Sequence, residues 1–312
     1  MSILYTLLKP IAKNLIKNKI HKEESYEEFA KISYDIQKKF RLKLPKHKGF
    51  NFKEKDINGF KVIIGENNGK THKKAILYLV GGGCRRWQMP FGNSLIRYMQ
   101  KTDSDIYLPL YPLYPDYNFL DEVKIILDTY GEMLKKYDSE DIIWLGFSAG
   151  ADLIMMCGKS IVKNLYDLPM PGLMIPVSPC NIFISEDSAK RMKEIEKRDI
   201  FMDSLCFDGF QKYYNRDGNI PRWIMGCAKE DDYKGFPKIR MYFGGDEVFS
   251  AEAEEYEKAF IRSDVKDFKI IVKEGMFHGY PLFTFLKEGK DGENEIIEEI
   301  NNKQNLSPKK FD

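Results

Sequence analysis

The chain has 312 residues, of which 43% are hydrophobic, so it can bury the core of one large domain. Its 49 Lys and Arg residues nearly balance 47 Asp and Glu residues, which excludes the broad basic surface of a nucleic-acid-binding protein. The five cysteines are scattered and have no partners at metal-binding spacing, so we expect no metal. Without an apolar run of bilayer length or a signal-peptide cleavage site, we expect a soluble, cytoplasmic protein.

The first 48 residues are typical of a small helical cap. Residues 1–20 place leucine and isoleucine on one helical face and lysines on the other, with an interruption near Pro10. This pattern predicts a basic, amphipathic helix. We favour a helix that docks on the body of the protein, and the alternative is an element that contacts a membrane surface. A second helical pattern covers residues 25–40.

Residues 49–312 are expected to form one α/β domain. An Asn58-Gly59 pair between alternating segments predicts a β-hairpin at its start. Short apolar runs, separated by helical patterns, then follow at residues 75–80, 106–110, 142–146, 173–178, 239–243 and 268–273. Strands buried on both faces and separated by helices indicate a doubly wound, mostly parallel sheet with helices on both faces.

The stretch IIWLGFSAGADLIMM, residues 142–156, predicts a sharp turn from a strand into a helix. Gly146 and Gly150 are small enough to let the neighbouring backbones approach, and Ser148 lies between them at the apex. Such an elbow exposes a serine hydroxyl as a nucleophile. The alternative is a loop serine between two chance glycines.

A nucleophilic serine needs a histidine base and an acid, which on a sheet of this type follow it in the order acid, then histidine. Three of the four histidines precede Ser148, and only His278 follows the last predicted strand. The stretch IRMYFGGDEV supplies Asp246 and Glu247 at a strand end. Spacing alone does not decide which of these two carboxylates faces the histidine.

Acyl transfer also requires N–H donors for the negatively charged oxygen that develops on the substrate carbonyl. Three glycines follow the strand of residues 75–80, and we expect the backbone N–H groups of Gly82, Gly83 and Ala149 to be these donors. Turns and phosphate-binding loops use such glycines too. No nucleotide-binding glycine motif is present, and no cofactor is implied.

Six separated motifs between residues 75 and 283 resemble, in order, those of the α/β-hydrolases, and within them the hormone-sensitive-lipase-like esterases. They read VGGGC, YPLYPD, GFSAGADL, VSPC, GFPKIRMYFGGDEVF and MFHGY. The resemblance implies a sheet of about eight strands, Ser148 as nucleophile, His278 as base, and the glycine loop with Ala149 as oxyanion hole. Its acid motif favours Glu247, and its N-terminal helices imply a cover over the acyl pocket.

Three departures from the family pattern concern groups that support the site. Val80 replaces the histidine before the glycines, Pro112 replaces an arginine, and Phe147 replaces the aspartate of the elbow. These changes remove supporting hydrogen bonds and leave the reacting groups in place.

The predicted function is therefore a serine carboxylesterase that hydrolyses small or short-chain acyl esters through an acyl-enzyme on Ser148. The alternatives are a catalytically weak or silent small-molecule binding protein of this fold and a membrane-associated lipase. The sequence indicates no oligomeric state. Nearby aromatic residues suggest a small apolar acyl pocket and fit core packing equally well: Trp87, Phe91, Phe147 and Phe277.

Overall fold

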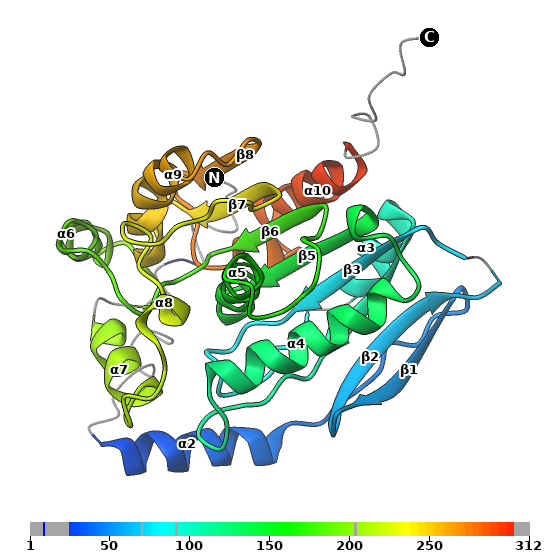
Figure 1. Cartoon of the computed structure of the whole chain (residues 1–312), viewed down its shortest axis with the longest axis horizontal. Helices are drawn as coiled ribbons and strands as arrows, with labels where there is room; N and C mark the ends of the chain where they lie inside the picture. The colour runs from blue at the N-terminus through cyan, green and yellow to red at the C-terminus, as the bar shows by residue number, and fades with distance from the viewer. Residues whose placement is uncertain (1–8, 10–24, 70, 91–92, 203–204, 303–312) are drawn as a thin grey trace, which may run out of the picture.

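An eight-stranded sheet with helices on both sides organises the chain (Figure 1). The computed structural model describes residues 9, 25–69, 71–90, 93–202 and 205–302. The strands are β1 (Phe50–Ile57), β2 (Phe60–Asn67), β3 (Lys74–Leu79), β4 (Ser104–Pro109), β5 (Ile142–Phe147), β6 (Leu173–Val177), β7 (Lys238–Gly244) and β8 (Phe268–Lys273). The helices are α2 (Tyr26–Lys39), α3 (Ser94–Thr102), α4 (Phe119–Leu134), α5 (Ala149–Val162), α6 (Glu186–Ile195), α7 (Leu205–Tyr214), α8 (Arg222–Met225), α9 (Ala253–Arg262) and α10 (Lys287–Asn302).

The strand order is β1-β2-β4-β3-β5-β6-β7-β8. The first two strands pair antiparallel, β2 joins β4 antiparallel, and all later neighbours are parallel. Each of the six apolar runs in the sequence forms one of the strands β3 to β8, with bounds shifted by at most two residues. The predicted fold class, a doubly wound and mostly parallel α/β sheet, is confirmed.

The hairpin that opens the main domain turns at the predicted dipeptide. Asn58 and Gly59 both have positive φ angles, 51° and 87°, and Ile57 pairs with Phe60 across the turn. Two consecutive residues with positive φ give a turn whose twist matches that of the flanking strands. The hairpin lies at one edge of the sheet, away from the strands that carry the site (Figure 1).

The sheet core is buried because helices cover both of its faces. Every residue of β3, β4, β5 and β6 is buried. Helices α4 and α5 pack together over one face, and α3 lies beside α10 (Figure 1). An ion pair joins α3 to α10, with Arg97 Nε 2.7 Å from Glu293 Oε2. These layers hold the carboxyl ends of the central strands in fixed relative positions.

Helix α2 realises the second of the two N-terminal helical patterns. Its N-cap is Ser25, whose hydroxyl accepts the Glu28 N–H at 3.2 Å, and Phe29 of its buried face stacks on Tyr213 of α7. The helix predicted over residues 1–20 lies outside the described residues, apart from Lys9. Among the residues that are described, no helix combines the length and apolar character needed to cross a membrane.

Candidate active site

Ser148 lies at the turn between β5 and α5 in an unusual backbone conformation. Its φ is 53° and its ψ is −127°, outside the regions that most residues adopt. A Cβ on Gly146 would lie 2.2 Å from the Gly150 carbonyl oxygen, and a Cβ on Gly150 would lie 2.4 Å from that of Leu79. The two glycines are therefore required by the close approach of α5 to β5 and β3.

The glycine loop lies beside Ser148 because the winding of the sheet reverses there. After β3 the chain forms β4 on one side, and it then returns to form β5 on the other. The loops that leave β3 and β5 therefore flank one crevice, the usual position of a ligand site in such sheets. A Cβ on Gly81 would lie 3.0 Å from Ser148 Cβ.

A hydrogen-bonded chain connects Ser148, His278 and Glu247. Ser148 Oγ is 2.8 Å from His278 Nε2, and His278 Nδ1 is 2.5 Å from Glu247 Oε2. The ring of Phe249 contacts the imidazole edge-on, with centroids 4.9 Å apart. The histidine can accept the serine proton while the carboxylate fixes its tautomer and stabilises the resulting cation.

The two adjacent carboxylates at the end of β7 have different partners. Glu247 is fully buried, and its Oε1 accepts hydrogen bonds from Gly244 N at 2.7 Å and from Ser178 Oγ at 2.8 Å. Asp246 instead pairs with Arg198 at 3.0 Å and with Lys9. The structure thus brings Glu247, and not Asp246, to the histidine.

Ser178 is a site residue that the sequence analysis did not identify. It follows β6 with a φ of 56°, is fully buried, and accepts the Gly279 N–H at 2.9 Å while donating to Glu247. One hydroxyl therefore ties the acid to the loop that carries His278. The VSPC motif contains this serine. The sequence does not show that its hydroxyl joins the loops that follow β6, β7 and β8.

Asp199, also missed, orders the backbone behind the acid. Its Oδ2 accepts the Val248 N–H at 2.7 Å, and its Oδ1 accepts the N–H groups of Phe201 and Met202. Burial raises the pKa of this carboxyl. Asp199 connects the residue after Glu247 to two residues that line the pocket described below.

The three backbone N–H groups expected to bind an oxyanion belong to the glycine loop and to the start of α5. Within the described part of the chain, the N–H groups of Gly82, Gly83 and Ala149 have no hydrogen-bond acceptor. Ala149 is the first residue of α5, where a helix leaves its N–H groups unbonded. These N–H groups are therefore not used elsewhere, and their role as oxyanion donors stays a prediction.

Tyrosines hold the glycine loop in this chain, in which Val80 stands where the resembling esterases have a histidine. The Tyr111 hydroxyl donates to the Val80 carbonyl at 2.8 Å, and the Tyr214 hydroxyl donates to the Gly83 carbonyl. Gln37 of α2 donates to the Arg85 carbonyl at 3.1 Å. The loop is therefore supported through its backbone carbonyls, and this support does not depend on the side chain at position 80.

A pocket of about 370 Å³ opens over Ser148 and His278. Its lining is mostly apolar and includes Ile32 and Ile36 of α2 together with Phe119, Phe147, Phe201, Phe249, Leu282 and Phe283. Of the aromatic residues suggested from the sequence, Phe147 lines it, whereas Trp87 and Phe277 do not. Trp87 packs on Phe40 instead, and Phe91 lies outside the described residues.

Charged side chains also reach this pocket. Arg85, Arg86 and Asp152 contribute to its lining. Burial raises the pKa of Asp152, whose Oδ1 accepts the Cys180 N–H. Burial and the neighbouring Arg85 charge lower the pKa of Arg86. The pocket wall therefore combines one carboxyl with two arginine side chains.

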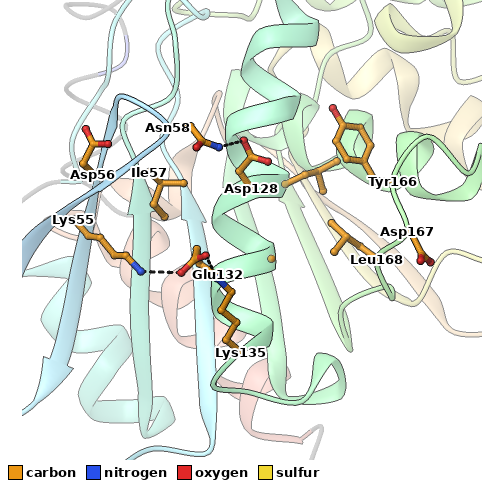
Figure 2. Close-up of a pocket in the computed structure, with 12 residues that line it drawn as sticks. Lys55, Asp56, Ile57, Asn58, Asp128, Glu132, Lys135, Tyr166, Asp167 and Leu168 are labelled. Atoms are coloured by element: carbon orange, nitrogen blue, oxygen red, sulfur yellow. Dashed lines mark hydrogen bonds and ion pairs between the residues drawn. The ribbon is translucent and has the colours of Figure 1, made fainter.

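A second cavity of about 580 Å³ lies between the β1–β2 hairpin and α4 (Figure 2). Figure 2 shows Lys55 paired with Glu132 and Asn58 paired with Asp128, at 2.8 Å and 2.7 Å. Among its described lining residues there is no serine, cysteine or histidine. It therefore lacks the nucleophile and base of the first pocket.

Comparisons with known proteins agree with this arrangement. A family model described as having the alpha/beta hydrolase fold matches residues 76–282. A search of curated proteins finds no match. Similar solved structures include EstE5 soaked with p-nitrophenyl butyrate (TM-score 0.78, 20% identity, 98% of this chain and 100% of that chain). Another is a putative esterase from Staphylococcus aureus (TM-score 0.78, 17% identity, 93% of this chain and 98% of that chain). A third is an esterase from the bacterial hormone-sensitive lipase family (TM-score 0.76, 18% identity, 97% of this chain and 99% of that chain).

Proposed function

This chain belongs to the α/β-hydrolase fold family, and from that premise we propose that it is a serine carboxylesterase acting on small or short-chain acyl esters. The observation that carries the proposal is the chain of short hydrogen bonds from Ser148 through His278 to Glu247. The family and the structurally similar esterases support a carboxylic ester hydrolase, in agreement with the resemblance found in the sequence.

In the first half of the proposed reaction, Ser148 Oγ attacks the ester carbonyl carbon as His278 Nε2 takes the serine proton. The carbonyl oxygen becomes negatively charged and binds the N–H groups of Gly82, Gly83 and Ala149. When the tetrahedral intermediate collapses, the bond to the alcohol oxygen breaks, and that oxygen takes the proton from His278. The acyl group is then bound to Ser148.

In the second half, water attacks the acyl carbonyl and gives its proton to His278. The second tetrahedral intermediate collapses, the bond to Ser148 Oγ breaks, and the serine recovers a proton from the histidine. One ester and one water thus yield one acid and one alcohol. The buried Glu247 carboxylate stabilises the imidazolium in both halves.

The size and lining of the pocket support a short acyl group. A volume of about 370 Å³ with mostly apolar walls fits a small ester more readily than a long chain. Helix α2 contributes Ile32 and Ile36 to these walls. In this proposal, residues 1–48 form a cap and residues 49–312 the catalytic domain.

The test is a series of p-nitrophenyl esters of increasing acyl length, beginning with acetate and butyrate. EstE5 was soaked with the butyrate ester, which makes that compound a suitable reference. We expect kcat/KM to be highest for the short esters and Ser148→Ala to abolish turnover. Ser139→Ala is the matched control, because Ser139 lies just before the first residue of β5, whereas Ser148 directly follows its last residue. This variant should keep full activity. Folded protein that turns over none of these esters would contradict the proposal.

A further inference from the structure

One wall of the pocket over Ser148 is built from apolar side chains. We call it the apolar wall, and its residues are Phe201, Met202, Phe249, Leu282 and Phe283. None of these five side chains carries a charge or an N–H or O–H group. The charged side chains that line the pocket belong to other elements: Arg85 and Arg86 to the glycine loop, and Asp152 to α5.

Three residues of the apolar wall are tied directly to His278. Gly279 follows the histidine, and a short 3₁₀ turn leads from it to Leu282 and Phe283. A Cβ on Gly279 would lie 3.7 Å from Leu282 Cδ1, so the leucine side chain lies beside this glycine. The ring of Phe249 contacts the imidazole itself, with centroids 4.9 Å apart. The apolar wall therefore begins at the catalytic histidine.

Ring contacts extend the apolar wall from the histidine loop to the protein surface. The Phe201 ring lies 5.6 Å from that of Phe277, the residue before His278, and 6.0 Å from that of Phe283. Phe277 and Phe283 are 5.0 Å apart. Phe283 also lies 6.0 Å from Phe285, which is 64% exposed. A group bound along this row can therefore reach beyond the closed part of the pocket.

The backbone of Phe201 is also fixed relative to the catalytic acid. The buried Asp199 carboxylate accepts the Phe201 N–H at 2.7 Å and the Met202 N–H at 3.0 Å. Its other oxygen accepts the N–H of Val248, the neighbour of Glu247, at 2.7 Å. One carboxylate thus connects this part of the apolar wall to the residue that orients the histidine.

The proposed reaction places the alcohol half of the ester on this side of the pocket. When the first tetrahedral intermediate collapses, the alcohol oxygen takes its proton from His278 Nε2, so it must lie within hydrogen-bonding distance of that atom. In the same mechanism the carbonyl oxygen binds the N–H groups of the glycine loop and Ala149. The rest of the alcohol therefore extends from the side on which His278 lies, where the apolar wall begins.

We propose that the preferred substrates are esters of apolar alcohols, above all those with an aromatic ring, and that Phe201 and Phe283 bind the alcohol group. The inference rests on the proposed esterase function and specifies the alcohol half of its substrate. An apolar alcohol packed on these rings loses contact with water, and an aromatic one gains ring-to-ring contact. A polyol would lose hydrogen bonds to water that these side chains cannot replace.

The test uses three butyrate esters that share one acyl group: benzyl, allyl and 2,3-dihydroxypropyl butyrate. Benzyl and allyl alcohol have similar acidity and the diol is more acidic, so leaving-group reactivity does not favour the benzyl ester. We would measure kcat/KM by titrating the released acid for the wild type, Phe201→Ala, Phe283→Ala and Phe283→Leu. Phe60→Ala is the matched control, because Phe60 is a half-buried aromatic residue that packs on Tyr117 outside the pocket.

We expect the wild type to hydrolyse the benzyl ester with a kcat/KM about tenfold or more above that of the 2,3-dihydroxypropyl ester. Phe201→Ala and Phe283→Ala should each lower the benzyl-to-allyl ratio by about three- to tenfold. Phe283→Leu, which keeps an apolar side chain, should lower it less, and Phe60→Ala should not change it. The ratio of allyl butyrate to allyl acetate should stay constant, because these two esters differ only in the acyl group.

Thermal unfolding verifies that each variant is folded, and three results contradict the inference while the esterase proposal stands. The first is a wild type that hydrolyses the 2,3-dihydroxypropyl ester as well as the benzyl ester. The second is an unchanged benzyl-to-allyl ratio in the folded alanine variants, or in Phe283→Leu if neither alanine variant folds. The third is a change in the butyrate-to-acetate ratio instead, because the apolar wall would then bind the acyl group. If folded wild-type protein hydrolyses no ester, including p-nitrophenyl butyrate, both proposals fail together.

Discussion

Replacing Ser178 by alanine tests whether one buried hydroxyl holds the acid and the histidine loop in register. The hydroxyl donates to Glu247 Oε1 at 2.8 Å and accepts the Gly279 N–H at 2.9 Å. Alanine removes both hydrogen bonds without filling new space. Ser178 does not line the pocket, so the substitution leaves the substrate contacts unchanged.

The expected cost follows from these two bonds. A hydrogen bond to a charged group contributes about 1.5–3 kcal/mol, and an unpaired buried N–H costs about 1–3 kcal/mol. The free energy of unfolding of Ser178→Ala should therefore fall by about 2.5–6 kcal/mol. Because Glu247 and the Gly279 backbone lose a shared anchor, we expect kcat to fall by about 10- to 100-fold with little change in KM.

Ser178→Gly separates the effect of losing the hydroxyl from the effect of backbone strain. The φ of Ser178 is 56°, a conformation that glycine adopts without strain and alanine does not. Ser178→Gly should thus be about as stable as Ser178→Ala or up to about 1 kcal/mol more stable. The loss of kcat should be the same in both variants, since both lack the hydroxyl.

The assay is steady-state hydrolysis of p-nitrophenyl butyrate, together with urea denaturation of each variant. A wild-type kcat in Ser178→Ala would refute the reasoning, because the histidine loop would then be held without the hydroxyl. A change confined to KM would also contradict it.

Three further predictions concern other parts of the site. Glu247→Gln should lower kcat by up to about 10⁴-fold, whereas Asp246→Asn should change it less than threefold or so, as measured with the same ester. Tyr214→Phe removes the hydroxyl that binds the Gly83 carbonyl and should lower kcat by about tenfold with the melting temperature nearly unchanged. Burial raises the pKa of Glu122, so the folded protein keeps a proton that the unfolded chain loses above about pH 5. Stability should fall as the pH rises from there through the raised pKa, by about 1.4 kcal/mol per pH unit. Glu122→Gln should remove this slope in denaturation measured at several pH values, and an unchanged slope would exclude Glu122 as its source.

Much of the fold follows from local pattern. The six apolar runs became β3 to β8 because a strand buried on both faces must be apolar throughout, and helices between them force parallel pairing. The positions of Ser148 and His278 could be predicted for a related reason. A strand-to-helix turn flanked by glycines has few solutions, and only one histidine follows it in the chain.

Features that depend on contacts between distant segments could not be predicted. Asp246 and Glu247 are adjacent, so no spacing rule predicts which of them faces the histidine. Ser178, which follows β6, helps to orient Glu247 by donating a hydrogen bond to it. The tyrosine supports of the glycine loop come from residues 31 and 131 positions further along the chain. These links form only when the strands are assembled.

The most direct test of the central claim is covalent labelling with a fluorophosphonate probe, followed by peptide mass spectrometry. An activated serine hydroxyl reacts with such a probe, whereas an ordinary one does not. We predict one adduct on Ser148 in the wild type, a greatly reduced yield in folded His278→Ala, and none in Ser148→Ala. Folded wild-type protein that stays unlabelled at Ser148, or labels equally without His278, would contradict the proposed serine esterase mechanism.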